Sequence, residues 1–111
     1  MEVVFKTERL RRDCCESKRM QRAWGANRSK ILRRRLDQIA AADTLEILRL
    51  VHRRTHELNG DRAGMISLDL DGGNRLLIEP AHTPPPCKPD GGLDWTRVTA
   101  VRVMAVEDTH D

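Results

Sequence analysis

Apolar positions follow a strand-like pattern at the start of the chain and a helical pattern after it. Residues 1–6 combine β-branched and aromatic side chains, which is typical of a short strand. Thr7 precedes an acidic residue and a series of apolar residues at helical spacing, so we expect Thr7 to cap a helix that begins at Glu8. Leu10 and Cys14 lie on one face of this predicted helix.

An interruption at residues 25–27, which contains a glycine, divides the helical pattern and predicts two helices rather than one. The second helix is predicted to run from about Arg28 to Ala42. Its apolar stripe consists of Ile31, Leu32, Leu36, Ile39 and Ala40. Residues 43–46 resemble a capping box and predict a further short helix that ends near Leu50.

The second half of the chain changes to an alternation of apolar and polar residues. Residues 65–70 and 75–79 are predicted strands, and the Asp-Gly-Gly-Asn sequence at 71–74 permits the positive φ of a hairpin turn. The stretch 80–96 is rich in proline and glycine and is predicted to be a long loop. Alternation returns in residues 98–107, which predict a final strand. One face of this final strand is predicted to carry Val101, Val103 and Ala105.

The order of one strand, then helices, then three strands predicts an α+β fold in one domain, residues 1–111. We expect the N-terminal strand to join an antiparallel sheet of about four strands beside a later strand, with the helix pair packed on one face. The apolar runs are too short for a membrane-spanning helix or a signal sequence. Cys14, Cys15 and Cys87 are too few and too unevenly spaced for a disulfide framework or a zinc site. A cytoplasmic location is therefore predicted, with one buried and one exposed thiol at the adjacent cysteines.

Charge is distributed unevenly along the chain. Residues 1–60 contain 15 Lys and Arg against 8 Asp and Glu, whereas residues 61–111 contain 5 against 9. Such a basic segment either forms a cationic face for a polyanion or only solvates the outer side of a helix. The basic residues of the second predicted helix are Lys30, Arg33, Arg34 and Arg35. With two Trp, one Phe and no Tyr, the chain is a poor candidate for binding single strands by stacking bases on aromatic side chains.

Two histidine-containing segments carry residues suited to metal binding or proton transfer. His52 and His56 are four residues apart, a spacing that can hold a metal ion on one helix, but the acidic residue of the zinc-protease pattern does not accompany them. We therefore expect no metal or cofactor. Asp108 and His110 follow the last predicted strand. They are either a solvated tail or an acid that orients a histidine, whose ordinary pKa near neutrality suits proton transfer.

The order and spacing of several short motifs resemble the RelE/ParE superfamily of toxins, and within it the HigB-like, or plasmid maintenance killer, branch. The opening strand and basic helices precede the motif His-x-Leu-x-Gly-Asp-Arg-x-Gly at 56–64. The hairpin ends in Asn-Arg-Leu-Leu-Ile-Glu-Pro at 74–80, and the last strand ends in Glu-Asp-x-His at 107–110. The segment Lys-Pro-Asp-Gly-Gly-Leu-Asp-Trp at 88–95 is similar to an insertion of longer members. The resemblance covers nearly the whole chain.

This resemblance implies a RelE-like fold and a toxin of a type II toxin–antitoxin system. HigB-like toxins cut mRNA in the decoding site of the ribosome without a metal ion. The 2′-hydroxyl of the substrate attacks the scissile phosphate, and basic side chains stabilise the charge on the phosphate oxygens. By the same resemblance, Arg75, helped by Arg62, would contact the phosphate. His56 and His110 would transfer protons, and Asp108 would orient a histidine.

The resemblance also implies partners. These are a HigA-like helix-turn-helix antitoxin, the ribosome with its mRNA, and operator DNA bound through the antitoxin, with no membrane partner. The basic helix would contact phosphates of ribosomal RNA.

The chain departs from the family pattern at several positions. Asn59 stands where the family often has lysine, and Thr109 stands where it commonly has tyrosine. Met65 and Ile66 stand where the family has aromatic residues. Two alternatives to the nuclease therefore stay open: a ParE-like toxin that blocks gyrase without cutting RNA, and a degenerate member that only binds its antitoxin.

Overall fold

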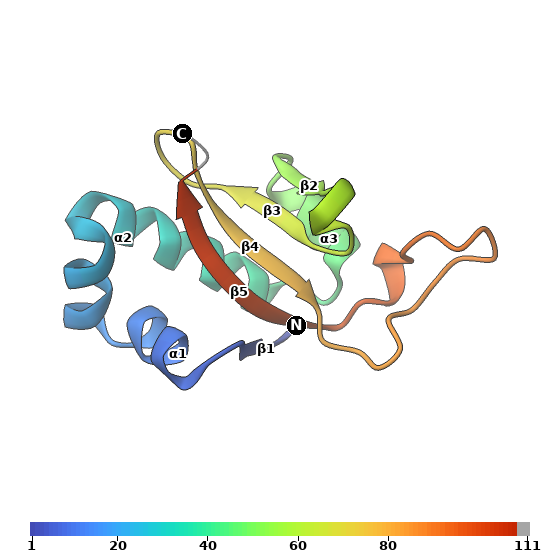
Figure 1. Ribbon diagram of the computed structural model, residues 1–111, viewed down its shortest axis with the longest axis horizontal. Coiled ribbons are helices and arrows are strands. Elements are labelled where there is room, and N and C mark those ends of the chain that lie inside the picture. Colours follow the sequence, from blue (N-terminus) through green and yellow to red (C-terminus); the bar gives the residue numbers. More distant parts are fainter. Residues whose placement is uncertain (109–111) are drawn as a thin grey trace.

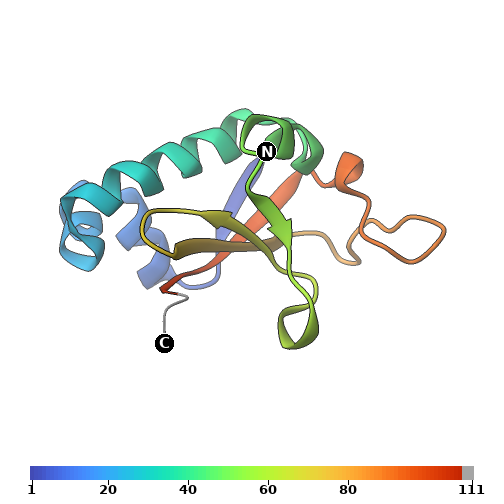
Figure 2. The same cartoon turned by 90° about the horizontal axis from the view of Figure 1, so that it is seen from above.

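The computed structural model describes residues 1–108 and shows an α+β fold (Figure 1). One sheet has the strand order β1-β5-β4-β3-β2. Its strands are β1 (Glu2–Phe5), β2 (Thr55–Glu57), β3 (Ile66–Asp69), β4 (Asn74–Pro80) and β5 (Ala100–Asp108). The helices are α1 (Glu8–Cys15), α2 (Ser17–Ala41) and α3 (Leu45–Val51), and two short 3₁₀ turns are η1 (Gly60–Arg62) and η2 (Trp95–Arg97). Helices α2 and α3 lie across one side of the sheet (Figure 2), and α1 packs against α2.

The predicted fold class is confirmed, but two details of the predicted sheet were wrong. The sheet has five strands rather than about four, and it is mixed because β1 pairs with β5 in parallel while the other pairs are antiparallel. Strand β2 was missed because its three residues, Thr-His-Glu, contain no apolar alternation. The parallel pairing of β1 is possible because most of the chain lies between β1 and β5 and supplies the crossover that parallel strands need.

Helix boundaries follow local signals in the sequence. The hydroxyls of Thr7 and Thr44 each accept a hydrogen bond from the backbone N–H three residues further on and cap α1 and α3. Thr7 is the predicted cap of α1, whereas the cap of α3 is the second residue of the predicted capping segment 43–46. Gly25 has φ 82° and ψ 164°, so it kinks α2 at the predicted interruption. A further break at Glu16, whose backbone is extended, separates α1 from α2 and was not predicted.

The core lies between the helices and the sheet. Cys14 belongs to this core and Cys15 is exposed, as predicted, and burial raises the pKa of the Cys14 thiol to about 12. The other fully buried core residues of α2, β3, β4 and β5 are Leu32, Ile39, Ile66, Leu68, Leu76, Ile78, Val101 and Val103. Within residues 1–108, no helix is both long enough and apolar enough to cross a membrane.

A β-bulge in β5 changes which residues of this strand face the helices. Successive residues of β4 pair with Ala105 and Val103, so Met104 is an extra residue in β5. Val101 and Val103 face the helices as predicted, but Ala105 lies on the opposite face, so that part of the prediction was wrong. Beyond the bulge, Glu107 also faces away from α2 and α3, on the same face as Ala105.

The predicted long loop connects β4 to β5 and projects from the sheet (Figure 1). It contains an isolated bridge between Cys87 and Leu93 and the turn η2. Trp95 anchors the loop: its indole N–H donates to Oε1 of Glu57 at 2.9 Å, and the Arg49 guanidinium lies 4.6 Å from the ring centroid. The loop is therefore attached to both α3 and β2.

Candidate active site

The site lies on the open face of the sheet, the face turned away from α2 and α3 (Figure 2). His56 in β2 pairs with Ser67 in β3, and Ser67 pairs with Leu77 in β4. Two residues away from Leu77 in β4, Arg75 pairs with Glu107 in β5. Because directly paired residues of antiparallel strands project to the same side, His56, Arg75 and Glu107 all lie on the open face.

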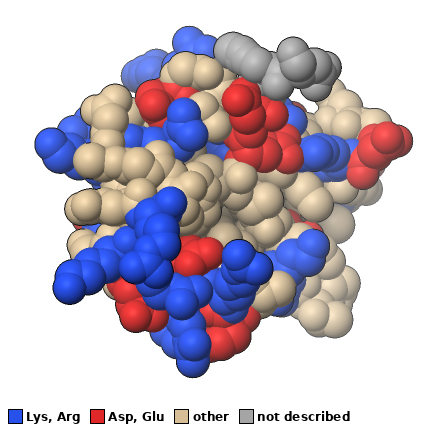
Figure 3. All heavy atoms as spheres, turned by 60° about the vertical axis from the view of Figure 1, so that its left-hand side comes forward, with Lys and Arg blue, Asp and Glu red and all other residues tan. Residues whose placement is uncertain are grey.

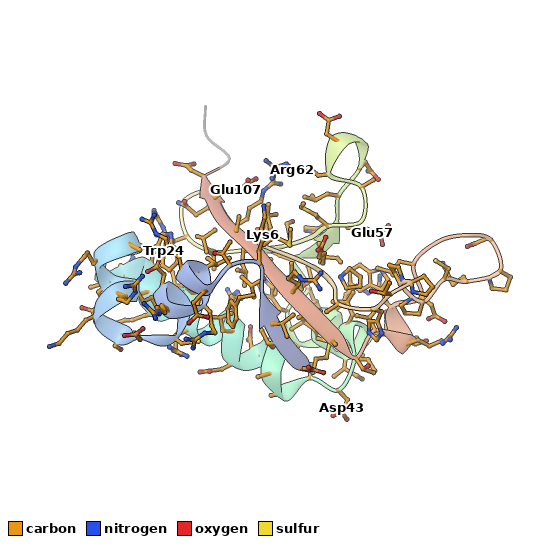
Figure 4. All side chains as sticks on the ribbon, turned by 60° about the horizontal axis from the view of Figure 1, so that its bottom comes forward. Lys6, Trp24, Asp43, Glu57, Arg62 and Glu107 are labelled. Carbon is orange, nitrogen blue, oxygen red and sulfur yellow. The ribbon has the colours of Figure 1, made fainter. Side chains whose placement is uncertain are left out.

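Two arginines meet at one carboxylate oxygen on this face. Oε1 of Glu107 accepts from Nε and Nη2 of Arg75 at 3.0 and 2.8 Å, and from Nη1 of Arg62 at 2.5 Å. Arg62 reaches this position from η1, whereas Arg75 and Glu107 come from paired strands. Figure 4 shows Arg62 beside Glu107 near the end of β5. Two guanidinium groups are therefore held together by one acidic side chain.

The charges of this cluster keep Glu107 ionised. The hydrogen bond from Arg62 is the largest influence, and together with Arg75 it outweighs burial and lowers the pKa of Glu107. The side chains of Arg75 and Glu107 are 25% and 23% exposed, and that of Arg62 is 43% exposed. The cluster carries two positive groups and one negative group, so it is net positive and reachable from solvent.

A hollow of about 460 Å³ on the same face joins Arg75 to His56. Its polar lining includes Arg54, Ser67 and Asp69, and Arg54 and Asp69 form an ion pair at its rim. His56 and Arg75 are two strands apart and two residues out of register. Their Cα atoms are therefore about 12 Å apart, from a strand spacing of about 4.8 Å and a rise of about 3.3 Å per residue. Side chains of this length can contact one phosphate and its neighbouring ribose from opposite sides of the hollow.

The structure does not place every predicted site residue in this hollow. Asp108 pairs with Asn74, one residue beyond Arg75 and Glu107, so it belongs to the opposite face of the sheet. Its neighbour Glu107 is the acidic residue beside Arg75, and the sequence interpretation missed it. The bulge at Met104 reverses the order of faces at this end of β5, so Val106 packs against the core. The three consecutive apolar residues 104–106 are the mark of this break in the alternation. His110 lies outside the described residues.

The basic residues of α2 do not form one surface with the hollow. Helix α2 covers the other side of the sheet (Figure 2). Arg33 donates to the backbone oxygen of Cys14 at 3.2 Å, and Arg35 donates to the backbone oxygen of Asp69 at 3.0 Å. Lys30 and Arg34 are exposed. Figure 3 shows Lys and Arg gathered in several places at the helical end of the molecule, with acidic side chains between them.

The two histidines that are four residues apart do not share a helix. His52 is the C-cap residue of α3, whereas His56 is exposed in β2. Burial, followed by the nearby positive charge of Arg35, lowers the pKa of His52. Among residues 1–108, no group of three or more His, Cys, Asp or Glu side chains could hold a metal ion.

Comparison of the chain with protein-family models, with curated proteins and with solved structures found no match.

Proposed function

We propose that this protein is the toxin of a type II toxin–antitoxin system and that it cuts mRNA on the ribosome. The motif order of the RelE/ParE superfamily, in its HigB-like branch, suggests this function. The observation that carries it is that three residues from two of these motifs, His56, Arg62 and Arg75, lie on one open face of the sheet. A face that is net positive, accessible and hollowed suits a phosphodiester of RNA.

The proposed reaction uses the substrate's own 2′-hydroxyl as the nucleophile. This oxygen attacks the adjacent phosphorus, a 2′,3′-cyclic phosphate forms, and the 5′-oxygen of the next nucleotide leaves. Arg75 and Arg62 would donate to the phosphate oxygens, where negative charge increases in the transition state. His56 would accept the 2′-hydroxyl proton or protonate the leaving oxygen, and His110 would perform the other transfer. In this mechanism the chain's own residues move the protons and stabilise the charge, and no metal ion takes part.

The position of α2 supports a separate role for its basic residues. Lys30 and Arg34 are exposed on the side of the sheet away from the hollow, so they would not contact the scissile phosphate. We propose that they contact ribosomal RNA while the open face receives the mRNA. Arg33 and Arg35 each donate to a backbone oxygen and have fewer donors left for RNA.

A toxin of this kind acts in the cytoplasm and needs an antitoxin. We propose that a HigA-like helix-turn-helix protein neutralises the chain and links it to operator DNA. Co-expression with the product of a neighbouring reading frame tests this part of the proposal. A stable complex and restored growth are expected, and unrelieved toxicity would contradict it.

The function is tested by expressing the chain and mapping the 5′ ends of cellular mRNA. New ends within translated codons are expected, and they should disappear when translation initiation is blocked, because cutting requires the ribosome. Growth arrest with intact mRNA and broken or abnormally supercoiled DNA would instead identify a gyrase inhibitor. Normal growth together with antitoxin binding would identify a protein that has lost its toxic activity.

A further inference from the structure

Glu107 lies between two arginines, at the position where an anionic ligand would be expected to bind. The backbone pairing of β4 and β5 places Arg75 directly opposite Glu107, and η1 brings Arg62 to the same carboxylate. A phosphate that binds these arginines must therefore approach a site where a negative charge is already present. The proposed chemistry does not account for this acidic residue.

A phosphate group can match the hydrogen-bond donors of these arginines better than the Glu107 carboxylate does. Nε and Nη2 of Arg75 both converge on Oε1 of Glu107, at 3.0 and 2.8 Å, and Arg62 donates to that same oxygen. A guanidinium fork is matched best by two oxygens of one anion, one for each donor. The two non-bridging oxygens of a phosphodiester supply that arrangement. The contacts with Glu107 use only part of the ten N–H donors that two arginines possess in total.

We propose that Glu107 is an internal competitor for phosphate, which holds Arg62 and Arg75 in the ligand-free protein and leaves them when a phosphate group binds. The inference rests on the proposed function, because it takes an RNA phosphate as the ligand. Two anions beside the same guanidinium groups repel each other, so the carboxylate and the phosphate exchange rather than share the site. The carboxylate also keeps the two like-charged arginines together in the absence of RNA.

The test compares phosphate binding by the wild-type chain with binding by Glu107→Gln. Glutamine has nearly the same shape and removes only the charge. The matched control is Glu79→Gln, because Glu79 makes a 2.9 Å ion pair with Arg102 on the same face of the sheet. Inorganic phosphate is titrated at constant ionic strength, and binding is followed by NMR shifts of the Arg62 and Arg75 side chains. We expect Glu107→Gln to bind about tenfold more tightly, or about 1.4 kcal/mol, and Glu79→Gln to change affinity less than twofold.

Equal or weaker phosphate binding by Glu107→Gln would overturn the inference, and weaker binding would identify Glu107 as a residue that only positions the arginines. A second measurement uses the wild-type chain, in case the variant does not fold. The pKa of Glu107 is measured by NMR in sulfate and in chloride of equal ionic strength. Displacement by sulfate should raise this pKa towards its ordinary value, and an unchanged pKa would contradict displacement. Neither measurement needs ribosomes or mRNA, so a failure of mRNA cleavage would count against the proposed function alone.

Discussion

Replacing Arg75 with alanine removes a guanidinium group that the proposed mechanism places on the scissile phosphate. The matched control is Arg102→Ala, which removes the partner of Glu79 in the adjacent β5 strand. Both arginines pair with one glutamate across β4 and β5, and both side chains are partly exposed, at 25% for Arg75 and 38% for Arg102. The two variants therefore remove similar structural contacts, and only one of them removes a proposed phosphate contact.

The structure predicts a small loss of stability and a large loss of activity for Arg75→Ala. A partly exposed ion pair contributes about 0–1 kcal/mol to the free energy of unfolding, and Glu107 keeps Arg62 as a partner in the variant. Losing one donor to the transition-state oxyanion lowers a rate by about 10²–10³-fold, or about 2.7–4 kcal/mol. Arg102→Ala should show the same small change in stability and less than about a threefold change in rate.

The assay combines urea unfolding with single-turnover cleavage of ribosome-bound mRNA by the purified variants. Reduced cleavage by Arg75→Ala, with a free energy of unfolding close to that of the wild type, would show that the variant loses activity and not its fold. Equal rates for Arg75→Ala and the wild type would refute the assignment of Arg75. Equal losses in both arginine variants would show that the sheet face matters only as structure.

Three further predictions concern the stability of the fold. The pKa of Glu107 is lowered in the folded chain, so its ionised form adds stability above pH 4.5, the ordinary pKa, and this contribution should disappear as the pH falls below that value. Urea unfolding between neutral and acidic pH should therefore show a smaller fall in the free energy of unfolding for Glu107→Gln than for the wild type. Parallel curves for the two proteins would contradict the ion pairs. Trp95→Phe loses the hydrogen bond to Glu57 and should lower the free energy of unfolding by about 0.5–1.5 kcal/mol; an unchanged value would mean that the loop is anchored by packing alone. Gly25→Ala should cost about 1–3 kcal/mol in thermal unfolding, because φ 82° with ψ 164° is strained for any residue with a Cβ. The control Asn27→Ala, at an exposed helical position nearby, should change the free energy of unfolding by no more than about 0.5 kcal/mol. Similar losses of stability in both variants would contradict the strained backbone conformation assigned to Gly25.

Most of the fold could be predicted from local patterns, because its longer elements have strong ones. The apolar stripe of α2, the turn residues between β3 and β4, and the alternation in β5 each correspond to an element in the structure. Strand β2 could not be predicted, since Thr55, His56 and Glu57 become a strand only by pairing with β3. The parallel pairing of β1 depends on contacts with β5, about a hundred residues away, which no local pattern reports.

The candidate site was predictable in part. The motifs identified Arg62, Arg75 and His56, and the structure brings these residues to one face. Glu107 was missed because a single extra residue, Met104, exchanges the two faces of β5 beyond it. Helical geometry could have distinguished Arg35 from the other three basic residues of α2. A turn of about 100° per residue places Arg35 on a different side of the helix from Lys30, Arg33 and Arg34.

The most direct test of the proposed function is chemical. A ribosome-bound mRNA is prepared with a single 2′-deoxynucleotide at the mapped cleavage position, and its cleavage by the purified chain is compared with that of the all-ribose mRNA. If the substrate's 2′-hydroxyl is the nucleophile, the ribose substrate yields a 2′,3′-cyclic phosphate and the deoxy substrate stays intact at that position. Cleavage of the deoxy substrate at the same position, or a 3′-hydroxyl end on the ribose product, would contradict the mechanism assigned to the open face of the sheet.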